Sequence, residues 1–263
     1  PKVLQEVFRK NILSLYYQNI KSKYKIQSLK NKATVSEQVL KNDLIQLGVK
    51  EGMKVMVHSS LPGLGYVQGG AKTVIKVLIN IIGEKGLLVM PSAPKLEYSE
   101  VIRGDWVFNV RETECATGII CETFRKSPDV FRSAHPTHSI SAWGSDADWL
   151  VKDHHLDDTP FGDNSPFARL MELGGYILGI GLDTRWITFY HHFEDTYANY
   201  PIQVYLPKKI LLHSMNAKGK MIDVTTYCHD NAVSSVRLNN APSTRKIIDQ
   251  ALTDFGNISR GKI

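Results

Sequence analysis

The stretch from Lys54 to Met90, KVMVHSSLPGLGYVQGGAKTVIKVLINIIGEKGLLVM, contains two apolar strands on either side of an apolar helix. We expect a strand at Lys54–His58, a glycine-rich loop at Gly63–Gly70, a helix at Ala71–Ile82 and a strand at Gly86–Met90. The order strand, helix, strand within one short segment is typical of parallel strands with helices packed on the sheet faces. This segment therefore predicts an α/β fold.

The segments on both sides continue this alternation of helices and strands. Upstream, Thr34 or Ser36 can cap a helix that runs to about Leu47 and ends at Gly48. Downstream, the patterns predict strands at 139–143 and 176–180, helices at 121–126, 147–152, 167–173 and 243–255, and a hairpin of 202–213 with 220–225. Residues 92–117 are irregular, as functional loops and lids often are. We expect one domain from residue 34 to 263.

The composition favours a folded protein without a membrane span. Hydrophobic residues make up 43% of the 263 residues, which is enough to fill a core. No apolar run reaches the ~20 residues of a membrane helix, and the first residues lack a signal-peptide core, so we expect a cytoplasmic protein. Cys115, Cys121 and Cys228 show no CxxC spacing, which favours reduced thiols over disulfides or a zinc site. Because Cys228 precedes His229 and Asp230, a thiol nucleophile stays open as an alternative.

Residues 1–33 differ from the rest and are predicted to form a helical extension. Apolar residues recur at helical spacing from Val3 to Tyr16, and a lysine-rich run follows. Eight lysines and arginines precede Ala33 against one acidic residue, so the net charge of +6 is largely local. We expect a helix that contacts a partner or a second subunit, and keep binding to anionic lipid or nucleic acid as the alternative. Without aromatic residues interleaved among the basic ones, the segment does not indicate sequence-specific reading of nucleic acid.

Hydroxyl groups and glycines follow the strand at 54–58. The stretch VHSSLPGLGYVQGGA, residues 57–71, places Ser59 and Ser60 directly after the strand, and Gly69 and Gly70 directly before the helix. Backbone N–H groups at such a turn and at the helix N-terminus suit a phosphate or pyrophosphate, although the spacing is neither that of a P-loop nor G-x-G-x-x-G. The alternative is a tight turn without a ligand.

The stretch GGYILGIGLDTRWITFYHHFEDTYANY, residues 174–200, carries the strongest candidate for catalysis. An apolar strand ends at a glycine turn, and a segment with helical periodicity follows it. His191 and Glu194 lie three residues apart and share one helix face. A neutral imidazole beside a carboxylate can take a proton near pH 7, as acyl transfer to an amine requires. The alternative is an aromatic core helix with a hydrogen-bonded histidine.

A second pair of histidines lies in FRSAHPTHSISAWG, residues 131–144. His135 and His138 flank Pro136, which prevents a regular helix, so the two rings need not share a face. Three-residue spacing without a nearby acid is a weak signal for a metal site. Arg132 and Ser133 are candidates for a phosphate contact, and the alternative is a turn that leads into a strand.

Five blocks, in this order, resemble the aminoglycoside 3-N-acetyltransferase family. The blocks are VHSSLPGLGYVQGGA (57–71), GEKGLLVMPS (83–92), RSAHPTHSISAWG (132–144), DNSPFARLMELGGYILGIGLD (163–183) and TFYHHFE (188–194). The resemblance covers residues 35 to about 230. It implies an αβα three-layer sandwich around a mixed, largely parallel sheet. It also implies transfer of acetyl from acetyl-coenzyme A to the amine of an amino sugar, without a metal.

The resemblance also implies roles for individual residues. The T-x-x-H-x-x-E block, here Thr188, His191 and Glu194, supplies the base: His191 takes the proton, and Glu194 orients or charges the ring. Glu97, after the M-P-S block, and Asp183, at a strand end, are expected to face the sugar amines. The coenzyme contacts are expected from Ser59, Ser60, Leu61, Gly69, Gly70 and Ala71, with Arg132 and Ser133 added.

The charge of the chain bears on the identity of the acceptor. Aminoglycosides are polycations, whereas this chain is basic overall, and residues 92–117 hold only a modest surplus of acids. We therefore hypothesise an acceptor that carries a phosphate or nucleotide, beside the aminoglycosides. Two other classes stay open: a metal-dependent hydrolase with His135, His138 and His191 as ligands, and a non-catalytic homologue that binds coenzyme or sugar.

Overall fold

The computed structural model describes residues 34–95, 106–183, 186–196, 198, 200–230, 232–233, 246 and 250. The predicted extension at 1–33, most of the predicted helix at 243–255, and Glu97 lie outside the described residues. The helices are α2 (Glu37–Leu47), α3 (Leu61–Leu64), α4 (Gly70–Ile82), α6 (Ile119–Arg125), α7 (Ala147–Val151), η1 (His154–Leu156), α8 (Pro166–Glu172) and α9 (Tyr190–Thr196). The strands are β1 (Thr34–Val35), β2 (Lys54–Ser59), β3 (Tyr66–Val67), β4 (Leu87–Pro91), β5 (Val107–Asn109), β6 (Phe131–Arg132), β7 (Ile140–Gly144), β8 (Tyr176–Ile180), β9 (Ile210–Met215) and β10 (Met221–Thr226).

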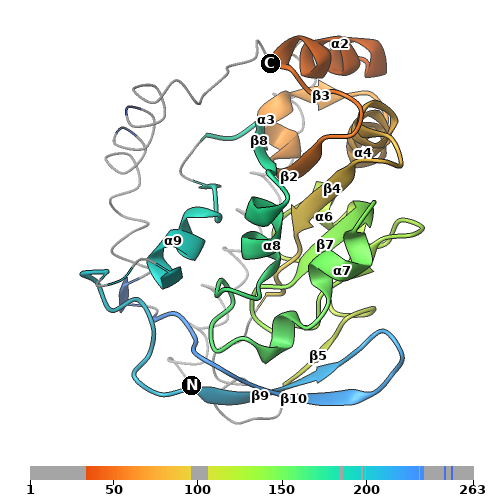
Figure 1. Ribbon diagram of the computed structural model, residues 1–263. Coiled ribbons are helices and arrows are strands. Elements are labelled where there is room, and N and C mark those ends of the chain that lie inside the picture. Colours follow the sequence, from red (N-terminus) through yellow and green to blue (C-terminus); the bar gives the residue numbers. More distant parts are fainter. Residues whose placement is uncertain are drawn as a thin grey trace, which may run out of the picture.

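A five-stranded sheet in the order β6-β7-β4-β2-β8 forms the centre of the structure (Figure 1). β2 pairs in parallel with β4 and with β8, whereas β7 pairs antiparallel with β4 and with β6. Within this sheet β7 therefore runs against the other four strands. Helices α2, α4 and α6 cover one face, and α7 and α8 cover the other. The predicted three-layer αβα sandwich around a mixed, largely parallel sheet is confirmed.

Side chains of the central strands alternate between the two faces, as the period of a strand requires. Val55 and Val57 of β2 pack into the core that α4 completes, whereas Met56 packs into the core formed with α7 and α8. β4 divides in the same way, with Leu88 in the first core and Val89 in the second. Burial on both faces explains why these strands are continuous apolar runs in the sequence.

Local signals in the sequence set the ends of the helices. Ser36 caps α2, because its hydroxyl accepts a hydrogen bond from the N–H of Val39 at 3.3 Å. Gly48 ends α2 in the left-handed conformation, with φ of 107°. For α2, α4, α6, α7, α8, β2, β4, β7 and β8 the predicted bounds agree with the structure within two residues.

A second sheet, in the order β10-β9-β5, lies apart from the central one. The predicted hairpin is confirmed as the antiparallel pair β9–β10. The predicted start of its first strand at residue 202 is wrong, because β9 begins at Ile210. Pro207 interrupts the predicted run, and proline cannot donate to a strand ladder. The predicted glycine-rich loop at 63–70 overlaps α3 and contains β3, which pairs with β1. Among the described residues no helix is both long and apolar enough to cross a membrane.

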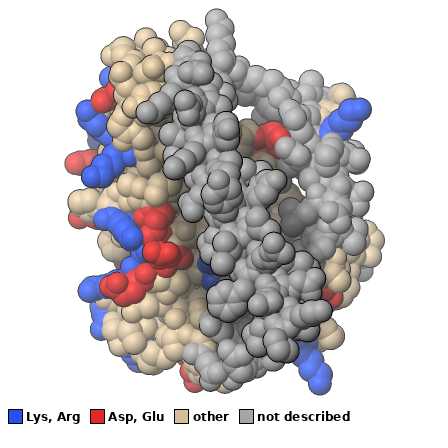
Figure 2. Space-filling model, turned by 180° about the vertical axis from the view of Figure 1, so that it is seen from behind, with Lys and Arg blue, Asp and Glu red and all other residues tan. Residues whose placement is uncertain are grey.

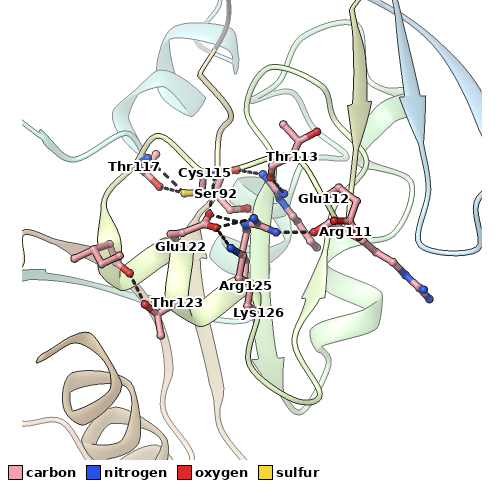
Figure 3. Close-up of polar contacts among 12 residues, drawn as sticks. Ser92, Arg111, Glu112, Thr113, Cys115, Thr117, Glu122, Thr123, Arg125 and Lys126 are labelled. Carbon is pink, nitrogen blue, oxygen red and sulfur yellow. Dashed lines mark hydrogen bonds and ion pairs between the residues drawn. The ribbon is translucent and has the colours of Figure 1, made fainter. Parts of the chain in front are cut away.

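An ion pair between the buried Arg125 and the half-buried Glu122 attaches the loop before α6 to that helix (Figure 3). Glu122 accepts a hydrogen bond from the backbone N–H of Cys115 at 2.7 Å, and its two oxygens pair with Nε and Nη2 of Arg125 at 2.6 and 2.7 Å. Arg125 also donates from Nη1 to the carbonyl oxygen of Arg111 at 2.7 Å. Burial raises the pKa of Glu122, but the bonds from Arg125, Lys126 and the Cys115 N–H outweigh it and lower the pKa to about 2. The carboxylate therefore stabilises the fold in its charged form.

We predict that Glu122→Gln lowers the free energy of unfolding by about 1–3 kcal/mol at pH 7, because the amide loses the charge-assisted bonds. In the wild type this contribution is complete above the ordinary pKa of 4.5 and is lost as the pH falls towards about 2. Urea unfolding from pH 7 to pH 3 should therefore show the two proteins converging at acid pH. Glu84→Gln, at an exposed position, is the control. A constant difference between Glu122→Gln and the wild type across this range would contradict the assignment.

Candidate active site

The short helix α9 holds an imidazole and a carboxylate in direct contact. Nδ1 of His191 lies 2.7 Å from Oε2 of Glu194, one helical turn further on. Tyr200 donates a hydrogen bond from its hydroxyl to Oε1 of the same carboxylate at 3.0 Å. The side chain of Glu194 is 6% exposed and that of His191 is 15% exposed. An Nδ1–H that donates to Glu194 leaves the lone pair of the ring on Nε2, which is the arrangement of a general base.

Aromatic rings surround His191 and fix its plane. Its ring centroid lies 4.4 Å from that of Tyr190, 5.0 Å from that of Phe161 and 5.0 Å from that of His229. His229 stacks between Phe161, at 5.8 Å and 18°, and Tyr205, at 4.7 Å and 20°. An isolated β-bridge between Tyr205 and His229 brings these two rings together. His229 is thus a member of the site that sequence reasoning missed.

A second histidine connects α9 to the central sheet. Nε2 of His58, near the end of β2, accepts a hydrogen bond from the backbone N–H of Thr188 at 2.9 Å. The carbonyl oxygen of Thr188 in turn accepts from the N–H of His191 at 3.1 Å. Burial lowers the pKa of His58 to about 4, so the ring is neutral at physiological pH and carries its proton on Nδ1. This Nδ1 is buried without a hydrogen-bond partner among the described residues, at a cost of about 1–3 kcal/mol.

The turns after β2 and β8 touch through their backbones. Ser60 donates its N–H to the carbonyl oxygen of Ile180 at 2.9 Å. A Cβ atom on Gly63 would overlap the carbonyl oxygen of Gly181, so only glycine allows this approach. The predicted coenzyme residues Ser59, Ser60 and Leu61 therefore lie at the same end of the sheet as the turn that leads to α9. This is the carboxyl end of parallel strands, where such sheets bind ligands.

The predicted glycine pair forms the N-terminus of α4. Gly69 and Gly70 both have positive φ, 75° and 62°, which glycine adopts without strain. A Cβ atom on Gly69 would collide with the hydroxyl of Thr73, which lies against the glycine backbone, whereas a Cβ atom on Gly70 would meet nothing closer than Leu61 at 4.0 Å. Ala71 is buried behind it. The N-terminus of this 13-residue helix presents N–H groups and the positive end of the helix dipole.

Of the two predicted acceptor-binding residues, the structure describes Asp183 but not Glu97. Asp183 follows β8 directly and is half-buried, and its carbonyl oxygen accepts the N–H of Trp186 at 3.2 Å. It therefore lies in the turn that contacts the segment after β2. Glu97 lies outside the described residues, so its predicted contact with the sugar stays a prediction.

The structure gives Arg132 and Ser133 a structural role in place of the predicted phosphate contact. Protein acceptors take the guanidinium N–H groups of Arg132, namely Ser139 Oγ at 3.2 Å and the carbonyl oxygens of Val110 at 3.2 Å, Thr113 at 2.6 Å and Ser92 at 2.6 Å. The hydroxyl of Ser133 accepts from the N–H of Ile140 at 2.9 Å and contacts Nδ1 of His154 at 2.9 Å. Both side chains are buried, so we leave them out of the coenzyme site.

The metal-dependent alternative required His135, His138 and His191 to share one ion. His135 is fully buried, with Nδ1 3.2 Å from the hydroxyl of Thr137 and Nε2 3.4 Å from that of Thr226. In the part of the chain that the structure describes, no group of three or more His, Cys, Asp or Glu residues is placed to hold a metal ion.

The thiol alternative is not supported either. Burial raises the pKa of Cys228 to about 11, so the thiol stays protonated near neutral pH. A nucleophilic cysteine needs the opposite shift, towards the thiolate. Cys121 behaves in the same way: burial raises its pKa to about 11, and its sulfur lies 4.0 Å from the hydroxyl of Ser59.

A family model described as "Aminoglycoside 3-N-acetyltransferase" matches residues 56–255. The chain belongs to this family. The match includes the turn after β2, the N-terminus of α4 and the His191–Glu194 pair. The resemblance that the five sequence blocks indicated is thereby confirmed.

Two relatives illustrate the distance within the family. The chain is 36% identical over 173 residues to the SPbeta prophage-derived aminoglycoside N(3')-acetyltransferase-like protein YokD of Bacillus subtilis, over 59% of this chain and 63% of that protein. It is 34% identical over 174 residues to aminoglycoside N(3)-acetyltransferase VII of Streptomyces paromomycinus, over 59% and 58%. The chain thus spans about six-tenths of the length of these two relatives.

Solved structures of the family share the fold. The structure described as AAC-IIIb binary with CoASH has a TM-score of 0.66 and 26% identity, over 76% of this chain and 77% of that one. The structure described as AAC-VIa bound to sisomicin has a TM-score of 0.66 and 30% identity, over 76% and 77%.

We predict that Gly63→Ala lowers the free energy of unfolding by about 1–3 kcal/mol, because the added methyl group forces the turns after β2 and β8 apart. Gly179→Ala is the matched control in the same region, since a Cβ atom there meets only ordinary contacts, with Leu182 at 3.4 Å. Urea unfolding of both variants measures the difference. Equal stabilities for the two variants would refute the close approach.

Proposed function

We propose that this protein is an N-acetyltransferase that moves acetyl from acetyl-coenzyme A to the amine of an amino sugar. The observation that carries the proposal is the contact of 2.7 Å between Nδ1 of His191 and the buried carboxylate of Glu194. The hydrogen bond from the Thr188 N–H to His58 supports the proposal, because this bond attaches the His191–Glu194 pair to the strand that leads into the proposed coenzyme turn. Membership of the family supports the reaction class.

The chemistry assigned to the chain is a proton transfer. Acetyl-coenzyme A supplies the activated thioester. The acceptor reacts as the neutral amine: its nitrogen lone pair forms the C–N bond while the C–S bond breaks, and Nε2 of His191 takes the proton that the nitrogen loses. The imidazolium is stabilised by Glu194 and then returns the proton to the departing sulfur or to solvent. No covalent bond to the protein is needed, because a neutral amine is itself a good nucleophile.

The coenzyme fits the turns at the carboxyl end of the sheet. At Gly70 the space that a Cβ atom would fill is open, and the N-terminus of α4 adds N–H donors suited to a phosphate or a carbonyl oxygen. Ser59 and Ser60 supply hydroxyl groups on the neighbouring turn. A solved relative described as a complex with CoASH supports this assignment.

We further propose that the acceptor is an aminoglycoside and not a nucleotide-linked sugar. The overall charge of +6 suggested a phosphate on the acceptor, but residues 1–32 hold eight basic residues and one acidic residue. The remaining chain has 24 basic and 25 acidic residues, so the part that forms the sheet is not basic. Figure 2 shows acidic and basic side chains next to one another along one side of the molecule. The relative with sisomicin bound favours a polycationic acceptor.

The first test of this proposal is His191→Ala. We predict that it lowers kcat by about 10²–10⁴-fold, the usual contribution of a general base. Acetyl-coenzyme A consumption with a saturating amine measures the effect, and His213→Ala, on β9, is the control for loss of a histidine elsewhere. Turnover near that of the wild type in His191→Ala would remove His191 from the mechanism.

The second test compares acceptors in the same assay. We predict turnover with aminoglycosides and none above background with a nucleotide-linked amino sugar, because residues 33–263 lack the positive balance that a nucleotide would require. The reverse preference would restore the phosphate-carrying acceptor. Coenzyme binding without transfer to any amine would instead favour the non-catalytic homologue.

A further inference from the structure

His58 is a buried histidine with only one of its two ring nitrogens in a hydrogen bond to the described residues. Its side chain is 3% exposed, and Nε2 accepts the backbone N–H of Thr188 at 2.9 Å, with the Thr188 hydroxyl at 3.3 Å. Nδ1 has no partner among the described residues. His154, by comparison, has both nitrogens bonded, at 2.9 and 2.8 Å. A buried donor without a partner is disfavoured, so such positions tend to be retained for function.

The hydrogen bond between His58 and Thr188 connects to the proposed base, His191, through a single residue. Thr188 precedes α9, and its carbonyl oxygen accepts the N–H of His191. His58 pairs with Gly179 in the parallel ladder of β2 and β8, and Ser59 and Ser60 follow it. The His58 imidazole therefore joins the strand that leads into the proposed coenzyme turn to Thr188, two residues before α9.

We propose that His58 is a positioning residue that sets the distance between His191 and the thioester. The inference rests on the proposed function. The bond to Thr188 needs an acceptor at the place of Nε2, and a neutral ring provides one. Loss of the acceptor leaves the N–H of Thr188 unpaired and lets the first turn of α9 move, and displacements of about 1 Å in a reacting group can reduce turnover 10²-fold.

Two substitutions separate the acceptor from the bulk of the ring. In His58→Gln the side-chain oxygen can reach the place of Nε2 and accept the same N–H, whereas His58→Phe fills the space without an acceptor. We expect His58→Phe to lower kcat by about 10–100-fold without a change in the KM for acetyl-coenzyme A, and His58→Gln to retain most of the turnover. His213→Gln, on the second sheet, is the control for replacing a histidine.

Hydrogen–deuterium exchange at the amide of Thr188 gives a readout that does not depend on activity. We expect slow exchange in the wild type and in His58→Gln, and faster exchange in His58→Phe.

Should His58→Phe fail to fold, the smaller His58→Leu also removes the acceptor. Normal turnover in a folded variant without the acceptor would overturn the inference. Loss of turnover in His58→Gln with the Thr188 amide still protected would also overturn it. In that case the hydrogen bond to Thr188 would be intact but would not be enough to maintain turnover. A wild type that acetylates no amine would instead count against the proposed function. The exchange comparison would still test the hydrogen bond between His58 and Thr188.

Discussion

The backbone contact between the turn after β2 and the turn after β8 is the constraint on which the candidate site depends. Parallel pairing of the two strands sends both turns to one end of the sheet, and Gly63 and Gly181 let them approach until no side chain fits between them. The turn after β2 leads towards the glycine pair of α4, and the turn after β8 leads towards α9. The residues proposed to bind the coenzyme and the proposed base can therefore come together although they are far apart in the chain.

The carboxylate of Glu194 is buried, and hydrogen bonds compensate for its removal from water. It is nearly inaccessible, yet its two oxygens have partners in His191 and Tyr200. A buried carboxylate without such partners would be costly and would tend to protonate. The neighbouring rings stiffen the site. Phe161 and Tyr205 hold His229 between them, and the Tyr205 hydroxyl donates to the carboxylate of Asp195, whose two oxygens lie 2.7 and 2.8 Å away.

Much of the fold could be predicted because its elements carry local signals. Each signal indicates one local conformation: an apolar run indicates the strand at 176–180, and Ser36 indicates a helix start. The glycines at 48 and 69–70 indicate helix ends. The pair His191 and Glu194 was visible because helical spacing places both on one face. Other parts of the site were not predictable in this way. The bridge between Tyr205 and His229 leaves no periodic pattern, and the bond from His58 to Thr188 spans 130 residues. Arg132 beside Ser133 resembled an anion site in the sequence, whereas in the structure Arg132 is buried and donates four hydrogen bonds to protein acceptors.

The pairing of β2 with β8 also has a consequence for how the chain is made. β4 follows β2 closely and can cover one of its edges early, but about 120 residues separate the end of β2 from the start of β8. At a synthesis rate of ~5–20 residues per second, the ribosome needs roughly 6–24 s to deliver the second neighbour. During that interval an apolar strand edge of the nascent polypeptide remains open to pairing with other chains. The same topology that assembles the site late thus gives molecular chaperones a defined window in which to bind.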